Sequence, residues 1–522
     1  MSKKKKGPGL KQGYGDFRLL SIRIAAVLLT AIAQPLLSAP FSWWPLHWIS
    51  WIPFFWAIQA QGATGRVFLG YIGGLASNLM IFYWIAITLH QYGGLMWPFA
   101  ILVTVLMCSC LTPLWIGLAG AYPWLKGRFP RGWVYLVPAL LVTLEFSLPQ
   151  LFPYMQGVSH YQVTHLFQIV SIFGIYGMSF LIFWANCLIY RCLEKTIQGK
   201  DWPRVQTATF CFVFALVFFY GLYRKYTYQH LLKDAKVVKV GLIQSNLTPK
   251  DHRDKGLYEI HELYMKLSQE AVKKGAQWII WSEGEFKRAL NYKHVLHFLK
   301  EESQKLKRPI LLGGRAFQVT DKGFRSLNSA IHIEPSGGVG RRHDKTILVP
   351  FGEYLPLRKQ LSFIYQFISW NPDMAPGKRM KTSTLDDISY AFLICYEAIY
   401  TELARKVVRK KARLLINITY DAWFGDTTAP YQHLMLAATR SAELGVPLIR
   451  LATTGVTTVV DPLGRMGKLS PPFKRKVLIY DVPIVYMPTL YTYIGNSFAW
   501  FCFFFVMAAF SHPLFAKSWE QL

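Results

Sequence analysis

The stretch VVKVGLIQSN, residues 237 to 246, is rich in β-branched and apolar residues and ends in polar ones, as buried strands do. It opens a series of similar runs that are separated by helix-like segments. The other strand candidates are 277–283, 308–314, 326–334, 390–397, 413–420 and 446–453. Helical patterns cover 256–275, 291–307, 399–411 and 429–444. This alternation predicts an α/β domain over residues 224–487.

The remainder of the chain is unusually apolar. Of the 522 residues, 52% are hydrophobic and 16% are aromatic, which exceeds what an ordinary soluble protein carries. A helix needs about 20 apolar residues to cross a bilayer. Stretches of that kind cover 19–39, 42–60, 67–88, 98–122, 133–149, 162–190, 207–223 and 494–513. We therefore expect a membrane domain over 1–223 with about seven transmembrane helices, and a last helix with a short tail over 488–522.

The basic residues between these spans predict an orientation. One set of loops carries the Lys and Arg residues, whereas the alternate loops, near 40, 89–97 and 150–161, contain none. Arg224 and Lys225 are a local exception. Because cytoplasmic loops are enriched in Lys and Arg, we expect both termini in the cytoplasm and the α/β domain on the opposite, outer side of the membrane. The basic loop residues are Arg66, Lys126, Arg128, Arg131, Arg191, Lys195, Lys200, Arg204 and Lys517.

The net charge of +29 is compatible with binding to nucleic acid, with binding to anionic lipid, or with the charge distribution that sets membrane topology. Its loop distribution favours topology, so we expect lipid and no nucleic acid as a partner. The seven cysteines show neither a CxxC pair nor a Cys/His metal spacing. We expect no metal, no cofactor and a monomer.

Three residues at predicted strand ends could carry chemistry: Glu283 after WIIWS, Lys345 in RRHDKTILVPFGEYLP, and Cys395 in YAFLICYEAIY. A cysteine nucleophile needs a base, and the tetrahedral intermediate needs a cation or N–H donors at its oxyanion. Each residue alone also fits an ordinary core or surface position. Glu285 would compete with Glu283 for the base role on chemistry alone.

The flanking motifs resemble those of the apolipoprotein N-acyltransferase family, membrane enzymes of the nitrilase superfamily. The resemblance covers nearly the whole chain, including the plan of spans and the loop LFPYMQG at 151–157. It implies a multi-span α-helical membrane domain joined to a nitrilase-type αββα sandwich. The motifs are WIIWSE (278–283), DKTILVPFGEYLPL (344–357), CYE (395–397), NITYDAWFGDTTAPYQH (417–433) and RSAELGVPLIRLATTGVT (440–457).

The resemblance also implies roles. Glu283 would be the general base, Lys345 the oxyanion stabiliser and Cys395 the nucleophile, with Glu353 orienting the lysine. Tyr396 and Glu397 match positions that the family needs for activity. The implied ping-pong reaction takes an acyl chain from a phospholipid onto Cys395 and passes it to the N-terminal amine of a diacylglyceryl-cysteine lipoprotein.

The sequence departs from the family pattern at two positions. Ser282 stands where the family usually has Pro before its base, and Arg253 aligns with an expected Trp. The triad residues themselves match, so the departures bear on contacts with lipid or acceptor rather than on the chemistry.

Aromatic residues supply further candidates for substrate contacts. The segment LSFIYQFISW, residues 361–370, could be a membrane-surface lid or a packed core helix. Trp423 and Phe424 could line a pocket or belong to the core. Glu145 could be an intramembrane functional group or an interfacial residue, and His433 is expected to be structural. The lid candidates are Phe363, Tyr365, Phe367 and Trp370.

Two other functions fit parts of the pattern. A membrane-anchored amidase or nitrilase would use the same triad to hydrolyse C–N bonds, but about eight spans exceed what an anchor requires. A lipid-binding or transport protein with an inactive catalytic domain is the second alternative, and the intact triad argues against it.

Overall fold

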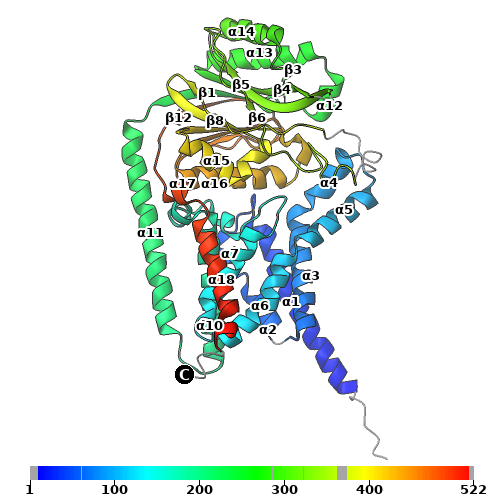
Figure 1. Cartoon of the computed structure of the whole chain (residues 1–522), viewed down its shortest axis with the longest axis vertical. Helices are drawn as coiled ribbons and strands as arrows, with labels where there is room; N and C mark the ends of the chain where they lie inside the picture. Colours follow the sequence, from blue (N-terminus) through cyan, green and yellow to red (C-terminus); the bar gives the residue numbers. More distant parts are fainter. Residues whose placement is uncertain (1–9, 60, 285, 321–322, 361–372, 517–522) are drawn as a thin grey trace, which may run out of the picture.

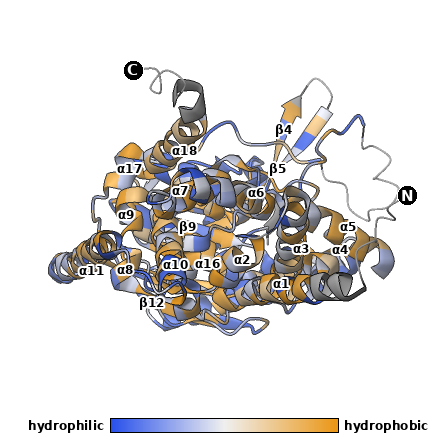
Figure 2. Cartoon of the chain, turned by 90° about the horizontal axis from the view of Figure 1, so that it is seen from below, coloured by the Kyte–Doolittle hydropathy of each residue, from blue (hydrophilic) through white to orange (hydrophobic). Residues whose placement is uncertain are grey.

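The computed structural model describes residues 10–516 except 60, 285, 321–322 and 361–372. Two sheets with their helices form one end of the molecule, and a bundle of long helices extends from them (Figure 1). Viewed from the far end of the bundle, apolar residues recur along its helices (Figure 2). Five helical stretches are long and apolar enough to cross a membrane: Arg18–Leu37, Ala63–Phe82, Trp97–Arg128, Ile175–Ile197 and Arg204–Lys233.

The bundle combines these stretches with shorter apolar helices, so that the chain has the membrane character expected of it. Its helices are α1 (Leu10–Leu37), α2 (Ile52–Gln59), α3 (Ala63–Phe82), α4 (Trp84–Gln91), α5 (Trp97–Cys110), α6 (Pro113–Arg128), α7 (Trp133–Ser147), α8 (Thr164–Phe167), α9 (Val170–Phe173), α10 (Ile175–Ile197), α11 (Arg204–Lys233), α17 (Leu490–Ile494) and α18 (Ser497–Ala516). The short 3-10 helices η1 (Trp44–Trp48) and η2 (Gln156–His160) join some of them.

Four predicted spans are not single helices, and one of them, 67–88, is divided at Tyr83 between α3 and α4. The stretch 42–60 forms η1 and the eight-residue α2, with prolines in the first turn of each. The stretch 98–122 is divided at Pro113, and 162–190 is divided at Gly174, whose φ is +66°. Proline lacks the N–H that continues a helix, and a positive φ is a conformation that glycine adopts readily. Hydropathy alone does not report these breaks.

The other end of the molecule contains two mixed sheets. Among the described residues, the larger follows the order β12-β1-β2-β4-β5-β6, with β3 paired to β4, and the smaller follows β11-β10-β9-β8-β7. The strands are β1 (Val237–Gln244), β2 (Trp278–Trp281), β3 (Phe286–Ala289), β4 (Ile310–Thr320), β5 (Gly323–Ile333), β6 (His343–Asp344), β7 (Ser383–Leu385), β8 (Ile388–Ile394), β9 (Leu414–Thr419), β10 (Leu448–Ala452), β11 (Thr458–Val460) and β12 (Lys476–Pro483).

The two sheets pack face to face. Side chains such as Val240 and Ile280 from the larger sheet meet Phe392 and Ile416 from the smaller one in a single buried cluster. Helices α13 (Leu257–Lys273) and α14 (Lys293–Leu306) pack on the larger sheet, and α15 (Thr401–Arg409) and α16 (Ala429–Leu444) pack on the smaller. This four-layer arrangement confirms the predicted αββα fold class.

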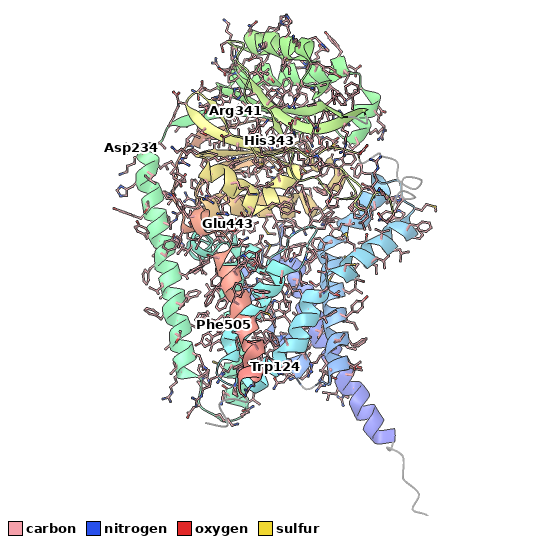
Figure 3. The ribbon with its side chains drawn as sticks, viewed as in Figure 1. Trp124, Asp234, Arg341, His343, Glu443 and Phe505 are labelled. Atoms are coloured by element: carbon pink, nitrogen blue, oxygen red, sulfur yellow. The ribbon has the colours of Figure 1, made fainter. Side chains whose placement is uncertain are left out.

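The smaller sheet's helices lie between the sheets and the bundle (Figure 1). Polar contacts join the two parts: Trp84 Nε1 donates to Gln432 Oε1 over 3.1 Å, and the Ile175 amide donates to Glu443 Oε1 over 3.1 Å. Glu443 lies at this junction, whereas Trp124 and Phe505 lie farther from the sheets along the bundle (Figure 3). The helical bundle therefore contacts the two-sheet part through α16, and Gln168 Nε2 adds a contact outside this helix by donating to the Leu463 carbonyl oxygen over 2.9 Å.

Candidate active site

Glu283, Lys345 and Cys395 follow the carboxyl ends of three strands. Glu283 lies just after β2, Lys345 directly after β6, and Cys395 directly after β8. Glu283 and Lys345 are buried, and Cys395 is partly exposed. The two sheets bring these ends together, so residues separated by more than a hundred positions act on one another electrostatically.

The Glu283 carboxylate is held by several donors. Asn328 Nδ2 donates to its Oε1 over 2.7 Å, and the Tyr420 amide donates to its Oε2 over 2.8 Å. The β4 strand approaches so closely that a Cβ at Gly313 would lie 2.9 Å from Glu283 Cα. Only glycine leaves room for this backbone approach. Both carboxylate oxygens are thus fixed in direction.

Lys345 lies between two carboxylates. Its Nζ donates to Glu353 Oε1 over 2.8 Å and is 3.4 Å from Glu283 Oε1. Asn328 Nδ2 also donates to Glu353 Oε1 over 3.1 Å, and the Val349 amide donates to Glu353 Oε2 over 2.9 Å. Since every partner is itself hydrogen-bonded, the ammonium has a fixed position.

Cys395 occupies a strained turn. Its φ is +49°, which is uncommon outside glycine, and it begins the 3-10 turn Cys395–Ile399. Asn417 Nδ2 lies 3.4 Å from the Cys395 carbonyl oxygen, and His433 Nε2 lies 3.3 Å from it. A sharp turn at a strand end directs the side chain out of the sheet, which is where a nucleophile has to be.

The electrostatics of the site favour a neutral thiol beside a charged lysine. Burial raises the pKa of the Cys395 thiol, and the charge of Glu283 adds to the rise. Burial also raises the pKa of Glu283, against the opposing effect of the Lys345 ammonium. Burial alone would lower the pKa of Lys345, but the Glu353 and Glu283 carboxylates hold it above its ordinary value. The thiol can therefore become a thiolate only by giving its proton to a nearby base.

Glu397 links the cysteine turn to the lysine segment. Its Oε2 accepts from the Ile394 amide over 2.8 Å and lies 2.9 Å from His343 Nε2, while its Oε1 accepts from the Thr346 amide over 2.6 Å. Burial opposes ionisation here, but His343 and these donors hold the pKa of Glu397 below its usual value. Glu397 thus fixes the distance between the two segments.

Tyr396 contacts the membrane half. Its hydroxyl donates to the carbonyl oxygen of Leu151, in the loop that follows α7, and Tyr400 donates to the Tyr396 hydroxyl over 2.9 Å. Tyr396 therefore links the cysteine turn to the helical bundle.

A buried ion pair behind the cysteine was not anticipated from the sequence. Arg450 Nη2 donates to Asp421 Oδ2 over 2.8 Å, Arg450 Nη1 donates to Asn417 Oδ1 over 2.5 Å, and His433 Nδ1 lies 3.1 Å from Asp421 Oδ1. Burial opposes ionisation of Asp421, but Arg450 and His433 lower its pKa to about 2. The sequence contained one signal for this pair, because Arg450 is a charged residue inside the apolar strand PLIRLAT. Asn328, a polar residue inside the strand SLNSAIHIE, is a signal of the same kind.

Replacing Arg450 by methionine is expected to destabilise the protein strongly. Both partners of the Arg450–Asp421 pair are fully buried, and removal of one partner of such a pair costs about 3–5 kcal/mol. Lys274→Met is the matched control, because the Lys274–Glu270 pair is half exposed and worth about 0–1 kcal/mol. Thermal unfolding of both variants in the same detergent measures the difference, and equal midpoints would contradict the prediction.

A small apolar cavity lies beside this cluster, between the bundle and α16. Phe424 and His433 line it, whereas Trp423 is 44% exposed and packs against Tyr92 at a ring distance of 5.6 Å. His433 is thus at a cavity wall as well as in the polar cluster. The remaining lining residues are Phe82, Trp84, Phe152, Tyr154, Ile399, Ala429, Gln432 and Leu436.

The remaining residues that the sequence singles out fall into two groups, one outside the described part of the chain and one that the structure places. Phe363, Tyr365, Phe367 and Trp370 of the predicted lid, and Glu285, lie outside the described residues. Ser282 is buried, with its Oγ 2.9 Å from Thr453 Oγ1, and Arg253 is exposed on the short helix α12 (Pro249–Asp254). Within the part of the chain that the structure describes, no group of three or more His, Cys, Asp or Glu residues could hold a metal ion.

Comparison with known proteins places both halves in established families. The carbon-nitrogen hydrolase family model matches residues 239–490, and the model of the apolipoprotein N-acyltransferase N-terminal domain matches residues 25–188. An apolipoprotein N-acyltransferase of Geobacter metallireducens is 34% identical over 472 residues, which cover 88% of this chain and 89% of that one. One from Haemophilus influenzae is 26% identical over 483 residues, which cover 88% of each chain.

Among solved structures, Nit3 of Saccharomyces cerevisiae, a member of branch 10 of the nitrilase superfamily, aligns with a TM-score of 0.38 and 18% identity. The alignment covers 48% of this chain and 90% of the yeast protein.

Proposed function

Since this chain belongs to the apolipoprotein N-acyltransferase family, we propose that it transfers an acyl chain from a phospholipid, through a Cys395 thioester, to the N-terminal amine of a diacylglyceryl-cysteine lipoprotein. The observation that carries the proposal is the constellation of Glu283, Lys345 and Cys395 at the joined strand ends, with Lys345 held 2.8 Å from Glu353. The contacts between α16 and the helical bundle support a substrate that arrives from the membrane.

In the first half-reaction, Glu283 accepts the proton of the Cys395 thiol as the sulfur attacks the ester carbonyl of the phospholipid. The negative charge that develops on the carbonyl oxygen is stabilised by the Lys345 ammonium. When the intermediate collapses, the C–O bond breaks, and protonated Glu283 returns its proton to the departing lysophospholipid alkoxide. The acyl chain is then bound to sulfur as a thioester.

In the second half-reaction, the N-terminal amine of the lipoprotein attacks the thioester carbonyl. Glu283 accepts a proton from the nitrogen, and Lys345 again stabilises the oxyanion. Cleavage of the C–S bond releases the amide, and the proton on Glu283 goes to the sulfur, which regenerates the thiol. A site with little water favours the amine over hydrolysis.

We also propose the orientation and domain limits that the sequence predicts: a membrane domain over 1–223, a periplasmic catalytic domain over 224–487, and cytoplasmic termini in a bacterial inner membrane. The ends of α6, α10 and α11 that lie away from the sheets support it (Figure 1). Those ends carry Lys126, Arg128, Lys195 and Arg204. Basic residues gathered at one end of a bundle mark the cytoplasmic side.

The rate of acyl-enzyme formation is expected to rise with pH through the raised pKa of Glu283. The base has to be ionised to accept the thiol proton, and burial places its pKa above the ordinary 4.5. The rate should therefore still be increasing at a pH where an exposed carboxylate is fully ionised. Single-turnover acylation measured from about pH 4 to 8 tests this; a rate that is flat or falls over that range would contradict it.

The transfer itself is tested with purified protein, phosphatidylethanolamine carrying a labelled acyl chain, and a diacylglyceryl-cysteine peptide. The proposal expects the label on the peptide amine, with lysophospholipid as coproduct. A peptide blocked by N-acetylation is the matched control and should receive no label. If small amides are hydrolysed at Cys395 while no labelled peptide forms with several phospholipids, the protein is a membrane amidase instead.

A further inference from the structure

We propose that Glu145 and His47, inside the helical bundle, are positioning residues for acyl transfer. They hold the loop from Leu148 to Val163, which we call the α7–α8 loop. The Leu151 carbonyl and the Phe152 ring of this loop fix Tyr396 beside the nucleophile. The inference rests on the proposed function, because its readout is acylation of Cys395.

Glu145 is bonded to the loop directly. It lies on α7 with 4% exposure, and its Oε1 accepts from the Gln156 amide over 2.6 Å. Gln150 Nε2 lies 3.4 Å from the Glu145 carbonyl oxygen, and Gln150 Oε1 accepts from the Tyr154 amide over 3.0 Å. An ionisable group within a membrane bundle is costly, so a position that keeps one points to a function.

His47 holds the same loop from another element. It is 1% exposed on η1, with Nε2 2.8 Å from Gln156 Oε1 and Nδ1 2.7 Å from Ser159 Oγ. The η1 segment is itself fixed, because Asn186 Nδ2 on α10 donates to the His47 carbonyl oxygen over 2.7 Å. The break of the predicted 42–60 span into η1 and α2 is what places this imidazole against the loop.

A third bond comes from α10, where Ser179 Oγ accepts from the Gly157 amide over 2.9 Å. Bonds from α7, η1 and α10 therefore converge on η2, the middle of the α7–α8 loop. Two other buried hydroxyls of the bundle, those of Thr104 and Thr143, donate only to the carbonyl four residues earlier in their own helices. Three separate elements thus hold the loop that reaches the active site.

The loop transmits its position to the cysteine turn through Tyr396. The Tyr396 hydroxyl donates to the Leu151 carbonyl, and the Tyr396 and Phe152 rings meet edge to face at 5.6 Å. Because Tyr396 directly follows Cys395 in the chain, a shift of the loop also shifts the backbone of Cys395. That residue is already in a strained conformation, with a φ of +49°. Small displacements of a nucleophile can cost about 100-fold in rate.

A double-mutant cycle on acylation tests the coupling. The single-turnover rate constant for acylation of Cys395 by phosphatidylethanolamine is measured by intact mass for Glu145→Leu, Glu145→Gln and Thr143→Val, each alone and with Tyr396→Phe. Normalisation to the final amount of acyl-enzyme removes any loss of folded protein. Thr143 is on the same helix and equally buried, and its hydroxyl bonds only within α7.

We expect Glu145→Leu to slow acylation about 10-fold or more alone but less than about 3-fold beside Tyr396→Phe, because coupled residues are not additive. Glu145→Gln, which keeps an acceptor oxygen, should restore most of the rate, and Thr143→Val should change it less than about 2-fold. Should Glu145→Leu not fold, His47→Asn takes its place with the same expectation.

If Glu145→Leu slows acylation by the same factor in the wild type and in Tyr396→Phe, the inference is overturned. Two independent defects multiply their effects on a rate, whereas coupled residues do not. Slowing by Thr143→Val as large as by Glu145→Leu would overturn it as well. Failure of the wild-type protein to form an acyl-enzyme would instead refute the proposed function, and this inference with it.

Discussion

A Cys395→Ala variant is expected to lose transfer to a diacylglyceryl peptide by about 10⁴-fold or more, with no acyl-enzyme at any time. Alanine removes the sulfur that forms the covalent intermediate, and a water molecule in its place would be a much weaker nucleophile than a thiolate. The loss should not be accompanied by unfolding, because the turn is held through its backbone: Asn417 and His433 both contact the Cys395 carbonyl oxygen.

Cys211→Ala and Cys502→Ala are the matched controls. Cys211 is exposed on α11 and Cys502 is buried in α18, so each tests whether loss of any thiol is sufficient. Transfer rates should equal that of the wild type in both. A Cys395→Ala protein that folds and still transfers at a tenth of the wild-type rate or faster would remove the thioester from the mechanism.

Replacing Lys345 by methionine is expected to slow acylation by more than about 10³-fold, because loss of an oxyanion donor alone costs about 10²–10³-fold. Lys345 lies between Glu283 and Glu353, which share Asn328 as a donor. Without the ammonium, the buried Glu283 carboxylate and the partly buried Glu353 carboxylate face one another, and one of them takes up a proton. Protonation of Glu283 would remove the base together with the oxyanion stabiliser.

The consequence specific to this explanation is a change in pH dependence. The acylation rate of Lys345→Met should rise with pH at higher values than in the wild type, because the pKa of the carboxylate pair increases. Lys359→Met, on the exposed surface of the same segment, is the control and should behave as the wild type. An unshifted pH profile in Lys345→Met would show that the lysine does not keep Glu283 ionised.

Much of the α/β domain could be predicted because its strands and helices are locally encoded. The apolar runs and amphipathic stretches gave the central strands and helices α13 to α16 to within a few residues. The short strands β3, β6, β7 and β11 were not predicted, and neither was β12, whose residues pair with β1 over the full strand. Strands of two to four residues carry too little periodicity to be recognised.

The candidate site could be proposed from the sequence where chemistry and strand ends coincide, as at Glu283, Lys345 and Cys395, and only with the help of the family resemblance. Asn328, Asp421 and Arg450 were missed because their partners are distant in sequence: Asn328 contacts Glu283 across 45 positions and Arg450 contacts Asp421 across 29. A buried polar residue in an apolar strand indicates an internal partner but does not identify it.

The membrane half was the least predictable. Hydropathy located the apolar stretches, but it did not locate the breaks between helices. Pro45, Pro53 and Pro113 lie in the first turns of helices, and Gly174 lies between α9 and α10. The polar bonds of His47 and Glu145 to the α7–α8 loop follow from those breaks. The sequence left Glu145 open between an intramembrane functional group and an interfacial residue, and its partner, a backbone amide, cannot be identified from side-chain patterns.

The intact mass of the purified protein after incubation with phosphatidylethanolamine, before and after a hydroxylamine wash, tests the central claim most directly. The mechanism predicts an added mass of one acyl chain, its removal by hydroxylamine as expected of a thioester, and its absence from Cys395→Ser. No added mass with any of several phospholipids, or an adduct that survives hydroxylamine or persists in Cys395→Ser, would contradict a Cys395 acyl-enzyme.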